Sequence, residues 1–174
     1  MMESNNQSKI AITRELLNQR IEKAVEYFKQ GYNCSQSVVA AFADLYDFTP
    51  EQAFKMAASF GGGIGRMRQT CGSACGMFLL AGLDCGAVDG KDREGKSNNY
   101  RVVQQLAENF KEINGSLICA ELLGLKKVQN DPNAEERTEQ YYKKRPCAKM
   151  VETAAKIYSN YIAEKLELET IKID

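Results

Sequence analysis

The sequence predicts an all-α fold, a single-domain bundle of six to seven helices. Apolar residues recur at helical spacing along nearly the whole chain, and no alternating run of β-branched residues competes with that pattern. The chain has 174 residues, of which 44% are hydrophobic and 26% charged, as expected for one globular domain. We place this helical domain at residues 13–168, between a polar N-terminal tail (1–12) and a C-terminal tail (169–174).

The first three helices are predicted from their start signals. Thr13 is a suitable N-cap for an amphipathic helix that ends near Gly31. Asn33 and Gln36 have the spacing of a capping box, in which each side chain binds the backbone N–H of the other. Thr49 is followed by a proline, which is favoured at the first position of a helix. The third helix should end before a glycine run at 61–65.

The second half of the chain continues the pattern. A helix starting at Thr70 and ending near residue 83 is apolar nearly all round, so we expect it to be the central helix. A polar loop should follow over 84–98. The remaining helices are expected at 99–114, at 117–123 behind the cap Ser116, at 134–144 on the surface, and from Pro146 to about 162. Within the surface helix, residues 135–137 are typical of a solvated face.

Composition excludes several kinds of function. The chain contains no histidine, which excludes a Ser-His-Asp triad, a Cys-His dyad and histidine-bound metals. A formal net charge of zero predicts no nucleic-acid partner. The polar residues 1–9 do not resemble a signal peptide, and no apolar run is long enough for membrane insertion. We therefore expect a cytoplasmic protein, in which the six cysteines are thiols or ligands and not structural disulfides.

Four of the cysteines share one position, the start of a predicted helix: Cys34, Cys71, Cys119 and Cys147. Free backbone N–H groups and the helix dipole favour a thiolate there. Nearby basic residues add to this effect: Arg66 and Arg68 precede Cys71, and Arg145 and Lys149 flank Cys147. The pattern predicts a shared functional cluster. The alternative is that each cysteine packs as a small core residue.

The other cysteines and the glycine run are less informative. Cys75 and Cys71 form a C-x-x-x-C pair on one helix face, and Cys85 lies in the following loop. The glycine run lacks the Gly-Lys-Ser/Thr of a phosphate-binding P-loop. Close packing is the favoured interpretation of these glycines. The other is an anion or cofactor site that would use Gly62, Gly63 and Arg66.

The chain resembles a known family, the C_GCAxxG_C_C family of redox-active proteins. The resemblance spans roughly residues 20–160 and is carried by the runs 31–38, 60–67, 70–72, 118–124 and 146–147. It implies that the family's four cysteines are Cys34, Cys71, Cys119 and Cys147. The motif reads Cys71-Gly72-Ser73-Ala74-Cys75-Gly76 here, with serine where alanine is usual.

Three functions stay open at this point. The first is thiol–disulfide exchange or electron transfer with a redox partner protein or a small thiol, with Cys71 as the expected attacking thiol. The second is a zinc or iron–sulfur centre with the same four cysteines as ligands. The third is a non-enzymatic helical interaction module. The exposed stretch 134–144 could serve a homodimer.

Overall fold

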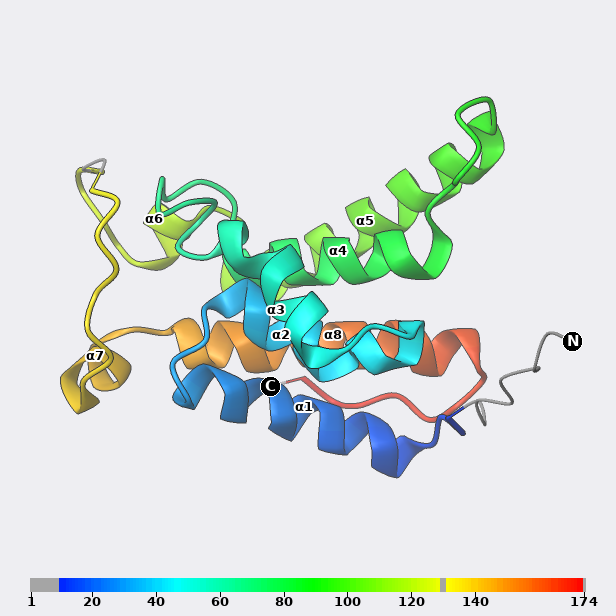
Figure 1. The fold of residues 1–174 in the computed structure, drawn as a ribbon, viewed down its shortest axis with the longest axis horizontal. Coiled ribbons are helices and arrows are strands. Elements are labelled where there is room, and N and C mark those ends of the chain that lie inside the picture. Colours follow the sequence, from blue (N-terminus) through cyan, green and yellow to red (C-terminus); the bar gives the residue numbers. More distant parts are fainter. Residues whose placement is uncertain (1–9, 129–130, 174) are drawn as a thin grey trace, which may run out of the picture.

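A computed structural model describes residues 10–128 and 131–173 of the chain (Figure 1). The prediction of an all-α fold is confirmed, because the described residues form helices and no strand. The α-helices are α1 (Arg14–Lys29), α2 (Cys34–Phe42), α3 (Pro50–Ala57), α4 (Gly72–Cys85), α5 (Arg93–Asn114), α6 (Cys119–Leu122), α7 (Glu139–Lys144) and α8 (Cys147–Lys165). Short 3₁₀ helices follow α2 (η1, Ala43–Tyr46) and α3 (η2, Ala58–Phe60).

The predicted caps of the first three helices are present. Thr13 accepts a hydrogen bond from the backbone of α1, and Thr49 forms a capping box at the start of α3. Asn33 and Gln36 form the capping box of α2 in both directions. These local signals work because each cap satisfies backbone N–H groups that the helix itself leaves unpaired.

Two predicted helix starts are wrong by a few residues. Thr70 does not cap α4 but forms an isolated antiparallel bridge with Ile118, so that Cys71 becomes the N-cap and α4 begins at Gly72. Ser116 accepts a hydrogen bond from the backbone of Ile118, and α6 begins only at Cys119. A contact between segments distant in the sequence replaces the local caps.

The helix lengths in the second half also differ from the prediction. α5 begins at Arg93, several residues before the predicted start, because Asp92 accepts a hydrogen bond from the backbone of Gly95 and caps it. The predicted surface helix at 134–144 is helical only over α7. The preceding residues 131–138 have no regular secondary structure.

The sequence predicts α4 as the central helix, but in the structure the central helix is α2. Eight of the nine residues of α2 are buried, and it packs against α1, α3, α4 and α8. Phe78, Leu79 and Leu83 of α4 remain half-buried, although α4 has the more apolar sequence. Figure 1 shows α4 and α5 together on one side of α2 and α8, with α1 on the other side.

The C-terminal residues beyond α8 fold back onto the bundle. Asn160 of α8 exchanges hydrogen bonds with the backbone of Ile171 in both directions, and Arg14 of α1 donates to the carbonyl oxygen of Thr170. The described residues of the predicted C-terminal tail (169–173) are therefore held against α1 and α8. Most of the predicted N-terminal tail (1–12) lies outside the described residues.

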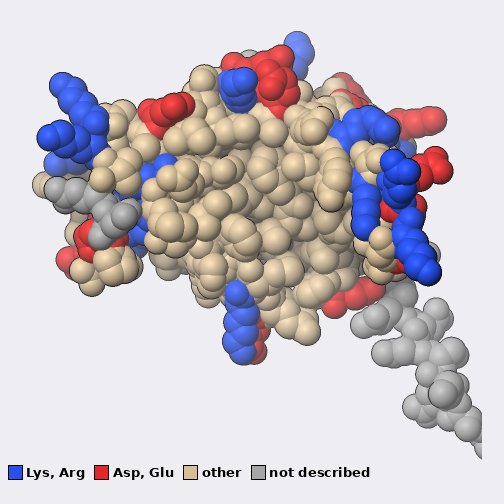
Figure 2. Space-filling model, turned by 90° about the horizontal axis from the view of Figure 1, so that it is seen from above, with Lys and Arg blue, Asp and Glu red and all other residues tan. Residues whose placement is uncertain are grey.

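Charged side chains are unevenly spread over the surface. Figure 2 shows that, on the face seen from above, they gather toward the two ends of the molecule and are sparse across the middle. Both signs occur at each end, so this face carries no broad patch of one charge. Among the described helices, none combines the length and the apolar character needed to cross a membrane.

Candidate functional site

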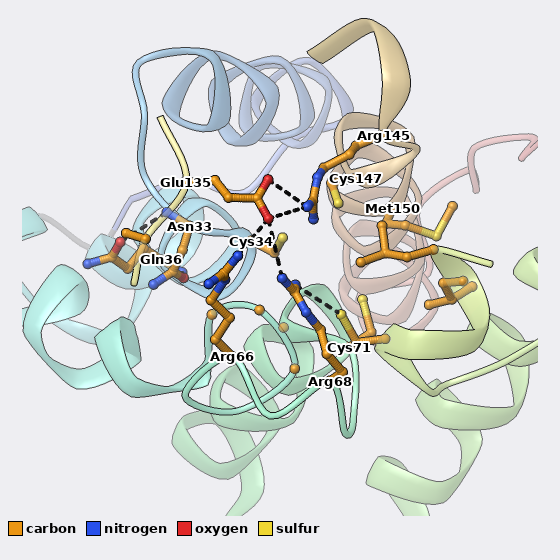
Figure 3. A pocket seen from close by; sticks show the side chains of 18 of the residues that line it. Asn33, Cys34, Gln36, Arg66, Arg68, Cys71, Glu135, Arg145, Cys147 and Met150 are labelled. Carbon is orange, nitrogen blue, oxygen red and sulfur yellow. Dashed lines mark hydrogen bonds and ion pairs between the residues drawn. The ribbon is translucent and has the colours of Figure 1, made fainter. Parts of the chain in front are cut away.

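A cavity of about 430 Å³ lies at one end of the bundle and brings the four predicted cysteines together. Its walls come from the starts of α2 and α8, the glycine-rich loop 61–71, α6 and the connection before α7 (Figure 3). The cysteines that line it are Cys34, Cys71, Cys119 and Cys147. Each is at most 9% exposed, so the sulfurs are reached through this cavity and not from the open surface.

Cys34 and Cys147 are placed by helix starts, as the sequence predicts. Each is the first residue of its helix, α2 and α8 respectively. The capping residue Asn33 also donates from its side chain to the carbonyl oxygen of Ala58, which ties the start of α2 to η2. Cys34 is thereby held by two elements that are distant in the sequence.

Cys71 and Cys119 are placed by the bridge between Thr70 and Ile118. The backbone N–H of Cys71 donates to the carbonyl oxygen of Leu117, and that of Cys119 donates to the carbonyl oxygen of Gln69, both at 2.7 Å. This pair of hydrogen bonds joins the start of α4 to the start of α6. It sets both cysteines on the same wall of the cavity.

The glycine-rich loop packs tightly against this wall. Gly63 has a φ of +72°, and a Cβ atom placed on it would lie 2.6 Å from the Cβ of Cys119. The backbone N–H groups of residues 64–69 donate to carbonyl oxygens of residues 59–64. The close approach to Cys119 therefore explains why residue 63 is a glycine. The N–H groups of residues 64–69 are already paired within the loop, which favours a packing role over anion binding by these N–H groups. Gly62, Gly63 and Arg66 nevertheless all line the cavity.

Two arginines of the loop adopt backbone conformations that are unusual for their type. Arg66 has a φ of +63° and Arg68 a φ of +61°, in the left-handed region that non-glycine residues rarely adopt. Both side chains line the cavity. Such strain persists where surrounding contacts hold it and is commonly found at functional sites.

Glu135 joins three arginines across the cavity. Its carboxylate lies 2.7 Å from Arg66, 3.6 Å from Arg68 and 2.5 Å from Arg145 (Figure 3). Burial alone would raise the pKa of this carboxyl, but Arg66, Arg145 and Arg68 outweigh it and hold the pKa below its ordinary value. The sequence interpretation of 135–137 as a solvated face missed this role, and no local motif signals it.

Cys147 is the thiol whose charged form is most favoured. Cys34 donates a thiol hydrogen bond to its sulfur, and this bond lowers the pKa of Cys147 to about 7 despite burial. Arg145, Arg137 and Arg68 add favourable charge. The same bond, together with burial, raises the pKa of Cys34 well above its ordinary range. One buried pair thus contains a thiolate acceptor and a thiol donor.

Cys71, the expected attacking thiol, does not have this environment. Burial raises its pKa to about 11, although backbone N–H groups of Ser73 and Ala74 oppose the shift. Arg68, which the sequence places before Cys71, donates to the sulfur of Cys119 at 4.0 Å. Burial also raises the pKa of Cys119, with Arg68 opposing it. Arg145 contributes at Cys147 as predicted, whereas Lys149 is exposed.

The remaining cysteines lie outside the lining of the cavity. The thiol of Cys75 donates to the carbonyl oxygen of Thr70, and burial raises its pKa to about 12. Cys85 ends α4, where its thiol donates to the carbonyl oxygen of Ala81. Neither residue is placed to react with a ligand in the cavity.

The described residues contain no group of three or more cysteines and carboxylates arranged to hold a metal ion. The four cysteines line one cavity, in which the thiols of Cys34 and Cys147 share a hydrogen bond. This arrangement favours chemistry at a pair of thiols over a four-ligand site.

Comparison with known proteins gives one match. A family model described as "Putative redox-active protein (C_GCAxxG_C_C)" matches residues 32–161, which include all four cavity cysteines. No curated protein and no solved structure matches the chain.

Proposed function

The chain belongs to the C_GCAxxG_C_C family, and from that premise we propose that it carries out thiol–disulfide exchange, with Cys147 as the attacking thiolate and Cys34 as the resolving thiol. The observation that supports this assignment is the hydrogen-bonded pair in which the two cysteines have opposite pKa shifts. Thiolates and not thiols are the nucleophiles of disulfide exchange. At neutral pH a pKa of about 7 leaves a substantial fraction of Cys147 charged.

The exchange proceeds in two steps. The Cys147 thiolate attacks one sulfur of a bound disulfide, the S–S bond of that disulfide breaks, and the leaving thiolate takes a proton from solvent. Cys34 then loses its proton to solvent and attacks the sulfur of Cys147, releasing the second half of the ligand as a thiol. The ligand disulfide gains two electrons, and the protein pair becomes a Cys34–Cys147 disulfide. An external dithiol reductant returns the pair to its starting state.

The raised pKa of Cys34 also sets the order of the two steps. Before the first step the raised pKa of Cys34 keeps this thiol protonated, because the sulfur of Cys147 beside it is charged. Formation of the mixed disulfide removes the Cys147 thiolate, and with it the charge that discourages ionisation of Cys34. The second step therefore becomes easier only once the first has occurred.

Peptide mapping of the oxidised protein tests the assignment. The reduced protein is treated with 2-hydroxyethyl disulfide, alkylated and analysed by mass spectrometry, and we expect a Cys34–Cys147 disulfide. Cys34→Ser should instead accumulate the mixed disulfide on Cys147, whereas Cys147→Ser should form neither product. Cys85→Ser, a change outside the cavity, is the matched control. First reaction at Cys71 or Cys119 would overturn the assignment.

Zinc or iron–sulfur binding by the same four cysteines is the alternative function. All four line one cavity, which is the observation in its favour. The absence of a three-ligand group among the described residues counts against it. Anaerobic purification followed by metal analysis and a visible spectrum separates the two functions. Stoichiometric iron or zinc that protects all four cysteines from alkylation would favour the metal centre.

A further inference from the structure

The cavity that holds the cysteines has an excess of positive charge, although the whole protein has a formal net charge of zero. Its lining contains four arginines and one glutamate, a net charge of +3 that falls to +2 when Cys147 is ionised: Arg66, Arg68, Arg137, Arg145 and Glu135. Arg66 is also paired with Asp131, at 2.8 Å. A recess lined mainly by one sign of charge concentrates ligands of the opposite sign. The cavity therefore selects for anions.

Arg137 offers this cavity a hydrogen-bond donor that is not used within the described part of the chain. Its guanidinium stacks on the rings of Phe28 and Tyr141, at 5.0 and 4.4 Å from their centroids. The Nη1 atom is buried and has no hydrogen-bond partner among the described residues. A buried donor without an acceptor is unfavourable by itself, and an anionic ligand would supply the acceptor.

Glu135 indicates which kind of anion fits. The three other arginines already surround its carboxylate, and Arg145 contacts both oxygens, at 2.5 and 2.6 Å. The planar, forked guanidinium suits a carboxylate in this geometry. A ligand carboxylate in this cavity could form the same kind of ion pair with an arginine that Glu135 forms.

The apolar part of the cavity wall indicates an organic ligand. Leu122, Leu123 and Met150 line the cavity beside the arginines. Its volume of about 430 Å³ lies within the range of ordinary small-molecule pockets, about 300 to 1,000 Å³. Room and apolar surface remain beyond what one inorganic oxyanion would occupy.

We propose that this cavity binds a low-molecular-weight disulfide or thiol that carries a carboxylate, with Arg137 as the free anchor for that carboxylate. The inference rests on the proposed function, since it names the substrate class of the same exchange site. Binding there places the ligand sulfur at Cys147 and the ligand carboxylate at Arg137.

A pair of alkylating reagents of matched size tests the charge preference without any disulfide chemistry. Iodoacetate and iodoacetamide are reacted separately with Cys147 in the reduced protein at low salt, and the ratio of their rates is compared with that for the unfolded protein. The folded protein should favour iodoacetate by about tenfold over the unfolded reference. Salt at about 1 M should remove most of this preference, because it shortens the screening length to about 3 Å.

Variants of the charged lining residues test whether the cavity causes the preference for iodoacetate. Arg137→Gln should reduce the ratio several-fold, and Glu135→Gln should increase it, because it removes the acidic lining residue. Arg101→Gln is the matched control, since Arg101 is exposed on α5 and does not line the cavity. An equal effect of Arg101→Gln and Arg137→Gln would overturn the assignment to Arg137.

Small disulfides test the substrate class itself. Exchange at Cys147 with dithiodiglycolate, which is anionic, should be faster than with neutral 2-hydroxyethyl disulfide and slowest with cationic cystamine. Equal rates for the three, with fast alkylation by iodoacetamide at neutral pH, would overturn this inference and leave the exchange function standing. Loss of alkylation at neutral pH would instead overturn the proposed function.

Discussion

Cys34, at the start of α2, donates its thiol hydrogen to the sulfur of Cys147, at the start of α8. The two residues are more than a hundred positions apart in the chain, yet they form one proton-sharing pair. Because each affects the ionisation of the other, the pair titrates as a unit. The shared proton leaves a substantial fraction of the Cys147 sulfur charged at neutral pH, while Cys34 stays protonated. Disulfide exchange needs one thiolate to attack and a second thiol to resolve the mixed disulfide.

Gly63→Ala should destabilise the protein and disturb the cavity wall. The new methyl group would meet the Cβ of Cys119 at 2.6 Å, and the backbone would be held at a φ of +72°. We expect a loss of about 1 to 3 kcal/mol in the free energy of unfolding, measured by urea denaturation.

Gly90→Ala is the control for that change, since a Cβ at Gly90 would meet no atom within 4 Å. It should leave the unfolding free energy nearly unchanged. Equal stability of the two variants would show that the loop does not need the close approach to Cys119.

Asn33→Ala should weaken the start of α2, because it removes both the capping box and the hydrogen bond to Ala58. The expected loss is about 1 to 2 kcal/mol of unfolding free energy. Asn33→Asp keeps the capping acceptor and loses only the donor to Ala58, so its stability should lie between wild type and Asn33→Ala. Denaturation curves for the three proteins check this order, and equal midpoints would contradict it.

Tyr158→Phe should destabilise the core without changing its shape. The fully buried hydroxyl of Tyr158 donates to the carbonyl oxygen of Leu80 and lies 2.5 Å from that of Tyr46. Removing it leaves buried polar groups with fewer partners, at a cost of about 1 to 3 kcal/mol. Tyr100→Phe, at a side chain that is 63% exposed, is the control and should be neutral in the same thermal or urea unfolding assay.

Local signals explain why so much of the fold could be predicted. Thr13, Asn33 and Thr49 cap their helices through side-chain contacts within three residues, which the sequence displays directly. The prediction fails where a distant segment competes with the local signal. Thr70 has the appearance of a cap, but its pairing with Ile118 moves the start of α4 to Gly72.

In the candidate site too, local signals could be predicted from the sequence, whereas contacts between distant segments could not. Helix starts and the family resemblance single out the four cysteines that line the cavity. Neither reveals that Cys34 contacts Cys147, because that contact depends on the packing of α2 and α8. The favourable effect of a helix start is also outweighed by burial at Cys71, where the pKa rises to about 11. Arg137 and Glu135 could not be assigned either, since their partners lie elsewhere in the chain.

The most direct test of the account is the pH dependence of alkylation at Cys147, measured by mass spectrometry with iodoacetamide from pH 5 to pH 10. A lowered pKa means that reactivity is present above about pH 7 and is lost as the pH falls through that value. Cys34→Ser keeps a hydroxyl donor and should retain a midpoint near 7, whereas Cys34→Ala removes the donor and should move the midpoint upward. A wild-type midpoint near 9, or one that Cys34→Ala leaves unchanged, would contradict the paired-thiol mechanism.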